Sequence, residues 1–196
     1  MEKTRLEAFS DGVLAIIITI MVLELKVPTS ATWSVLFDLW PVASSYVLSF
    51  IFIGIYWGNH HHLLHTVKNV NASIIWGNLN LLFWLSLIPF ATAWMGENHF
   101  SPKTVVVYAI LLLVCGISYS ILQRAIFNTQ RHGGSLKAAF MKMERKGIFS
   151  VVAYTAAIPM AFVNTIISYL LFLTVSIVWI IQDKSIEKAL KQKSIE

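Results

Sequence analysis

Arg5-Leu-Glu-Ala-Phe-Ser-Asp11 is the stretch of sequence that decides the fold, because it runs directly into the apolar segment 12–25. A carboxylate or guanidinium group at membrane depth costs about 2.5–3.5 kcal/mol on insertion scales, so such groups usually face protein or water. We therefore expect this stretch to begin a membrane-spanning helix whose charged end contacts other helices.

The composition is that of an integral membrane protein. Of 196 residues, 57% are hydrophobic and 13% are charged, whereas soluble domains carry roughly 25% charged residues. Apolar runs that could cross a bilayer as helices recur at 5–26, 35–58, 72–95, 104–127, 147–163 and 165–181. The last two runs are interrupted only by Pro159 and Asn164, and one helix of their joint length would reach about 50 Å, so we expect a tight hairpin.

The sequence thus predicts an all-α polytopic membrane protein with six transmembrane helices. Residues 1–182 form the transmembrane domain and 183–196 a short cytoplasmic tail. Thirteen of the fifteen Lys and Arg residues fall on one side of this arrangement, and only Lys26 and Lys103 fall opposite. Since cytoplasmic loops accumulate basic residues, both termini should be cytoplasmic. The basic residues are dispersed over several loops without interleaved aromatic residues, so nucleic acid is not an expected partner.

The charged end of the first helix needs partners from other helices. Glu7 and Asp11 are four residues apart and share a face, while Arg5 lies on another side. We expect a polar brace to the ends of the second and third helices, which offer donors at the same depth. The donors at this depth are Tyr56, Trp57, Asn59, His60, Asn71, Trp76, Asn78 and Asn80, and the candidate partners taken from them are His60, Trp76 and Asn80.

The apolar part of the first helix carries a stripe of branched side chains. At 100° per residue, Ile16, Ile20 and Leu23 share one face, with Thr19 beside Ile16 and Phe9 below. Such a stripe on a membrane helix is more often lipid-facing or part of the core than functional.

Arg5, Phe9, Ser10 and Asp11 form the pattern Arg-x-x-x-Phe-Ser-Asp at the start of a first helix. This pattern resembles the signature of the transmembrane protein 175 family of potassium channels. The resemblance implies a potassium-selective cation channel of the single-repeat bacterial type, a homotetramer in the inner (plasma) membrane, with K⁺ as permeant ion and no cofactor. It also implies that helix 1 lines the pore.

Within that helix, the resemblance places the narrowest ring at Ile16, further apolar rings at Ile20 and Leu23, and an influence on ion preference at Thr19. It assigns Arg5, Phe9, Ser10 and Asp11 to the family motif and to the brace.

Three further readings stay open at this point. A small secondary transporter of cations or protons is the main alternative to a channel. His61 and His65 have the i,i+4 spacing of metal ligands, although no matching cluster elsewhere completes a shell. Residues 128–146 contain a basic amphipathic segment that either lies at the membrane interface or extends the fifth helix. The sequence lacks the Thr-Val-Gly-Tyr-Gly filter, so a channel of this kind would differ from the familiar potassium-channel plan. It also lacks the common catalytic fingerprints, so an enzyme is not expected.

Overall fold

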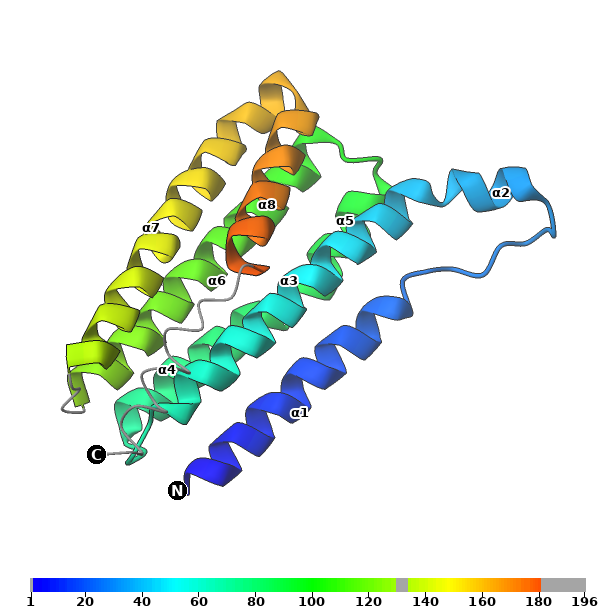
Figure 1. Cartoon of the computed structure of the whole chain (residues 1–196). Coiled ribbons are helices and arrows are strands. Elements are labelled where there is room, and N and C mark those ends of the chain that lie inside the picture. Colours follow the sequence, from blue (N-terminus) through cyan, green and yellow to red (C-terminus); the bar gives the residue numbers. More distant parts are fainter. Residues whose placement is uncertain (1, 130–133, 181–196) are drawn as a thin grey trace.

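The computed structural model describes residues 2–129 and 134–180, and side chains in the second range from Lys137 onward. The described residues form helices that run up and down beside one another, with α1 at one edge next to α3 (Figure 1). In chain order they are α1 (Lys3–Val22), α2 (Trp33–Asp38), α3 (Trp40–His65), α4 (Ala72–Leu85), α5 (Ile88–Glu97), α6 (Pro102–Thr129), α7 (Gly134–Val163) and α8 (Thr165–Ile180). The expected all-α architecture is confirmed.

The first half of the chain differs from the expected runs at α2 and α3. The run expected at 35–58 divides, because its beginning forms the short α2 and α3 starts only at Trp40. Helix α3 then continues through the histidines to His65. The histidines therefore belong to a helix that also packs in the core.

The end of the chain forms the expected hairpin. Helix α7 ends at Val163 and α8 begins at Thr165. Asn164 Oδ1 accepts a hydrogen bond from Ile166 N at 2.9 Å, which satisfies one of the free amides at the start of α8. Helix α7 begins at Gly134, so the basic amphipathic segment is an extension of this helix.

Helices α4 and α5 make one rod with a break at Ser86 and Leu87. Pro89 lies in the first turn of α5 and has no amide hydrogen to donate to the carbonyl of Leu85. Together the two helices, Ala72–Glu97, are long and apolar enough to cross a membrane.

Within the described ranges, four helical segments have the length and composition of membrane spans: Trp40–His65, Ala72–Glu97, Pro102–Thr129 and Lys137–Val163. Helix α8 is apolar but shorter, at 16 residues. Helix α1 has 20 residues, and its first half carries Arg5, Glu7 and Asp11.

The rods pack closely where small residues meet. A Cβ atom on Gly96 of α5 would lie 2.5 Å from Ser45 Oγ and 2.8 Å from Val42 Cα on α3, so only glycine permits this approach. One turn away, the buried hydroxyl of Ser49 lies 2.6 Å from Thr92 Oγ1 on α5 and 2.8 Å from the Tyr108 hydroxyl on α6. These contacts make α3, α5 and α6 a rigid support for α1.

Candidate functional site

Helix α1 has one face buried in the bundle and one face bare. The buried face consists of Leu6, Ser10, Leu14, Ile17 and Met21, spaced at three and four residues. The bare face carries large apolar side chains spaced by seven, four and three residues, with exposed fractions of 53% for Phe9, 58% for Ile16, 45% for Ile20 and 74% for Leu23. The Ile16 stripe thus lies on a different side of α1 from the buried face.

The charged end of α1 is tied to α3 and α4 by a buried chain of hydrogen bonds. His60 Nε2 on α3 donates to Asn78 Oδ1 on α4 at 2.6 Å, and Asn78 Nδ2 donates to Ser10 Oγ at 2.9 Å. The Ser10 hydroxyl in turn donates to the carbonyl of Leu6 at 2.8 Å. All three side chains are almost fully buried, so each bond forms where water cannot replace it.

Asp11 and the first turn of α1 add a second connection to α3. Trp57 Nε1 donates to Asp11 Oδ1 at 3.0 Å, which gives the half-buried carboxylate one charge-assisted bond. Lys3 Nζ donates to the carbonyl of His65 at 3.0 Å and lies 3.6 Å from Glu7 Oε1. The lysine therefore gives a hydrogen bond to a carbonyl in the last turn of α3, and its positive charge offsets that of the Glu7 carboxylate.

The opposite end of α1 is held by an ion pair with α5. The Lys26 ammonium donates to Glu97 Oε1. That hydrogen bond, with the attraction of the Glu97 carboxylate, raises the pKa of Lys26 above its usual value. Both side chains are exposed, so this contact is screened and contributes less than the buried chain.

The structure places only one of the three candidate partners in the brace. His60 belongs to the buried chain, whereas Asn80 Nδ2 donates to Ser118 Oγ on α6 and Trp76 is 71% exposed. The expectation that Asn80 contacts α1 is therefore wrong, and Trp76 does not face α1 within this chain. Asn78 and Trp57 take those places.

The spacing of the apolar residues in α4 indicates that Asn78 lies on the buried face of that helix. Ile74, Asn78, Leu81 and Leu85 are separated by four, three and four residues, so they share the buried face. Trp76 and Asn80 each lie two residues from a member of this stripe and thus point elsewhere.

An open groove lies beside the bare face of α1. It has a volume of about 600 Å³ and runs between α1 and the α4–α5 rod, with Ile16 and Ile20 on one wall and Phe90 and Trp94 on the other. Glu24 and Glu97 lie at its end near the α1–α2 loop. A mostly apolar groove with carboxylates at one end is suited to helix contact along its length and to cations at its mouth.

The Thr19 side chain is exposed on the same side as Ile16. Its oxygen lies 3.1 Å from the carbonyl of Ala15 and 2.9 Å from that of Ile16, so the hydroxyl proton is used within the helix. A hydroxyl that donates backwards in this way keeps its oxygen lone pairs available to a cation.

The histidines at the end of α3 do not assemble a metal centre. The rings of His61 and His65 are 4.5 Å apart between centroids. Across residues 2–129 and 137–180, no group of three or more His, Cys, Asp or Glu side chains is placed to hold a metal ion.

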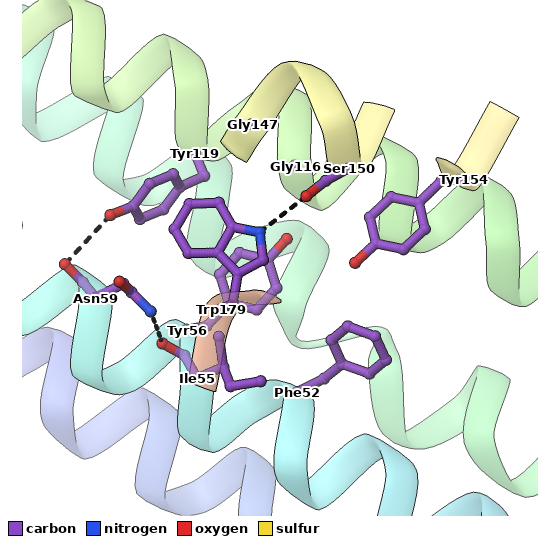
Figure 2. Close-up of a pocket in the computed structure, with 10 residues that line it drawn as sticks. All are labelled: Phe52, Ile55, Tyr56, Asn59, Gly116, Tyr119, Gly147, Ser150, Tyr154 and Trp179. Carbon is purple, nitrogen blue, oxygen red and sulfur yellow. Dashed lines mark hydrogen bonds between the residues drawn. The ribbon is translucent and has the colours of Figure 1, made fainter. Parts of the chain in front are cut away.

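A small cavity lies inside the bundle. It lies between α3, α6, α7 and α8 and is lined by Tyr56, Tyr119, Tyr154 and Trp179 among others (Figure 2). Its volume of about 30 Å³ is close to that of one water molecule. Among the described residues that line it, none carries a charge. This cavity is too small to carry a hydrated ion through the middle of one chain.

Known proteins resemble this chain in both sequence and fold. The family described as "Endosomal/lysosomal potassium channel TMEM175" matches residues 5–89. A potassium channel of Chryseobacterium sp. (strain P1-3) is 49% identical over 192 residues, covering 98% of this chain and 100% of that protein. A potassium channel of Streptomyces collinus is 35% identical over 129 residues, or 62% of this chain and 63% of that protein.

A solved structure agrees over nearly the whole chain. The crystal structure of a lysosomal potassium-selective channel TMEM175 homolog from Chamaesiphon minutus superposes with a TM-score of 0.80 at 28% identity. The superposition covers 91% of this chain and 96% of that one.

Replacing Asn78 by leucine tests the buried chain. Asn78→Leu keeps the branched four-atom shape of the side chain but leaves the His60 N–H without its acceptor, so the free energy of unfolding should fall by about 1–3 kcal/mol. The double variant His60→Phe, Asn78→Leu removes both polar partners and should recover part of that loss. Thermal unfolding in detergent measures both, and strictly additive losses would show that the two side chains are not coupled.

Proposed function

Because the chain belongs to the TMEM175 family, we propose that it is a potassium-selective cation channel in which the α1 helices of four identical chains line the pore. The resemblance carried by Arg5, Phe9, Ser10 and Asp11 is confirmed by the family match and by the relatives. The protein is an integral membrane protein. The pore, the residues that line it, the number of subunits and the orientation of the chain in the membrane are parts of this proposal.

The bare face of α1 is the observation that carries the proposal. Exposed apolar residues also occur on α6, α7 and α8, where lipid can cover them. The stripe on α1 differs because an open groove runs beside it and because the polar groups of the same helix are fixed at one end. A neighbouring copy of α1 can contact this side without disturbing either feature.

In a fourfold arrangement the exposed stripe becomes a series of rings. Ile16 forms the constriction, and Ile20 and Leu23 form wider apolar rings towards the mouth near Glu24. Rings of branched carbons gate flow by excluding water. Thr19 adds oxygen atoms one turn from the constriction, where they replace part of the hydration shell of K⁺ and favour it over Na⁺, whose shell is harder to remove.

Two of the four motif residues act in this proposal as structural groups, because Ser10 and Asp11 hold the buried side of α1 against α3 and α4. Arg5 and Phe9 lie on the exposed side of α1, so within one chain they are not part of the brace as expected. Substitution of Ser10 or Asp11 should impair assembly before it alters ion preference.

A channel fits this interior better than the alternative of a secondary transporter. Carriers of the known folds bind their ion near the bilayer midplane at sites built within the chain, often at broken helices. The cavity inside this bundle holds about one water molecule and is lined by uncharged side chains among the described residues. The path is therefore proposed to lie between chains.

The proposed topology has six crossings with both termini in the cytoplasm. The four long spans, α8 and α1 all follow one another in alternating directions (Figure 1). Helix α1 can cross despite its charges because Ser10 and Asp11 have partners on α3 and α4 and need not face lipid. The plasma membrane of a bacterium is the proposed location, the permeant ion is K⁺, and no cofactor is invoked. The tail at 183–196 lies outside the described residues.

Flux from liposomes tests the proposal as a whole. Purified protein in potassium-loaded vesicles should pass K⁺ down its gradient without coupling to another ion, with Na⁺, Cs⁺ and H⁺ tested as competitors. Flux that saturates and requires a counter-transported ion would favour the transporter.

Ile16→Asn should raise the leak of both K⁺ and Na⁺, because a polar ring at the constriction admits water. Ile177→Asn is the matched control, since Ile177 on α8 has the same exposed fraction of 58% and lies outside the proposed pore. Ion flux per tetramer in liposomes is the measurement. If wild type and both variants form intact tetramers and show equal ion flux, Ile16 lies outside the pore.

Thr19→Ala should preserve conduction and move the K⁺/Na⁺ permeability ratio towards unity, because the oxygens that replace water around K⁺ are removed. Thr174→Ala on α8 is the control, as its exposed hydroxyl also bonds to its own helix, at 2.8 Å from the Leu170 carbonyl. Reversal potentials under bi-ionic conditions report the ratio. An unchanged ratio in Thr19→Ala would leave the apolar rings as the source of selectivity.

A further inference from the structure

The end of α6 and the beginning of α7 lie in the most basic part of the sequence. Between residues 124 and 146 it contains six Lys and Arg residues and a single acidic residue, Glu144. Topology accounts for an excess of basic residues on this side, but it does not require them to line a cavity.

A cavity of about 320 Å³ lies at this end of the bundle, between α6 and α7. Arg124 and Lys137 contribute their positive charges to its wall, together with Glu144 and the polar side chains of Ser120, Gln123 and Asn128. Apolar side chains, Phe127, Phe140 and Met141, complete it. The charged lining residues sum to one net positive charge.

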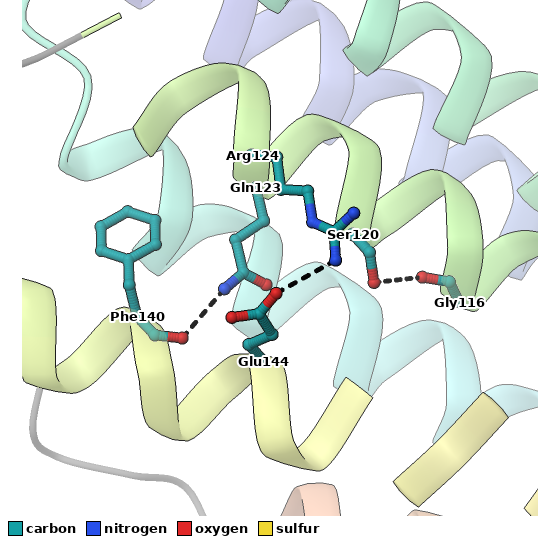
Figure 3. A network of polar contacts seen from close by, with 6 residues as sticks. All are labelled: Gly116, Ser120, Gln123, Arg124, Phe140 and Glu144. Carbon is teal, nitrogen blue, oxygen red and sulfur yellow. Dashed lines mark hydrogen bonds and ion pairs between the residues drawn. The ribbon is translucent and has the colours of Figure 1, made fainter. Parts of the chain in front are cut away.

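The cavity is built on fixed side chains (Figure 3). Gln123 Nε2 donates to the carbonyl of Phe140 at 3.1 Å from a buried position, which sets the distance between α6 and α7. Arg124 Nη2 donates to Glu144 Oε1 at 3.1 Å, which uses one of the five N–H groups of the guanidinium. The pair holds Arg124 across the cavity, and both side chains are exposed.

The same helix faces continue from the cavity into exposed apolar side chains. On α7, Lys137, Met141, Glu144 and Ile148 are spaced by four, three and four residues and share a face. On α6, Asn128, Arg124, Ile121 and Ile117 do likewise. Ile117, Ile121 and Ile148 are exposed. A cavity with a net positive charge thus lies on helix faces that continue as an apolar strip along the membrane spans.

We propose that this cavity binds the phosphate-bearing headgroup of an anionic phospholipid, whose acyl chains lie along Ile117, Ile121 and Ile148. Basic pockets between helices at the cytoplasmic face attract such headgroups because the phosphate finds positive charge and hydrogen-bond donors together. The inference rests on the proposed orientation, in which this end of the bundle lies at the cytoplasmic surface. It does not depend on which ion the channel passes.

Binding of phosphatidylglycerol to the purified tetramer in neutral detergent, followed by native mass spectrometry, tests this site. Phosphatidylglycerol should bind more tightly than phosphatidylcholine. Lys137→Gln should weaken phosphatidylglycerol binding about fivefold, the effect of one basic residue near an anionic lipid. Glu144→Gln should strengthen it, because the cavity then loses its one negative charge, and a gain cannot result from misfolding.

Arg145→Gln is the matched control, because Arg145 is exposed on the same helix but does not line the cavity. It should leave phosphatidylglycerol binding unchanged. Equal losses in Lys137→Gln and Arg145→Gln would show diffuse surface attraction and overturn the site. Displacement of the lipid by inorganic phosphate at equal concentration would assign the cavity to free phosphate instead. Potassium flux is not a readout here, so a failed channel assay would leave this result intact.

Discussion

The buried hydrogen bonds from His60 through Asn78 to Ser10 are the constraint on which the arrangement of α1 depends. These hydrogen bonds fix the rotation of α1 as well as its position, because Ser10 can accept from Asn78 only when it faces α4. Leu14, Ile17 and Met21 then follow into the core on the same face. A buried donor left without an acceptor costs about 1–3 kcal/mol, so other rotations of the helix are disfavoured.

Fixing one face of α1 leaves the other available. Ile16, Ile20 and Leu23 remain uncovered in the single chain, beside the groove that α1 forms with α5. The close contact at Gly96 and the cluster of Ser49, Thr92 and Tyr108 keep the support behind α1 rigid. The polar groups of α1 therefore serve its attachment, and its apolar stripe is what it presents to other copies.

Much of the fold follows from the sequence because long apolar runs leave few alternatives in a bilayer. The hairpin at Asn164 was predictable, since one helix across both runs would be too long. The short α2 and the residue at which α7 begins, Gly134, do not follow from the sequence in this way. The change from apolar to polar residues marks where a helix leaves the membrane, but the helix itself can continue beyond that point. In the brace, polarity and depth indicate His60 but do not distinguish Asn78 from Asn80. The difference lies in the spacing of α4, which places Asn78 on the buried face with Ile74 and Leu81.

Disulfide formation between neighbouring α1 helices tests most directly that the bare stripe faces other copies around a pore. In a Cys115→Ser background, Ile16→Cys and Ile17→Cys differ by one position but point to the exposed and the buried face. In membranes, mild oxidation should link subunits through Ile16→Cys and not through Ile17→Cys. Absent linkage at Ile16→Cys, or equal linkage at both positions, in assembled protein would contradict the account.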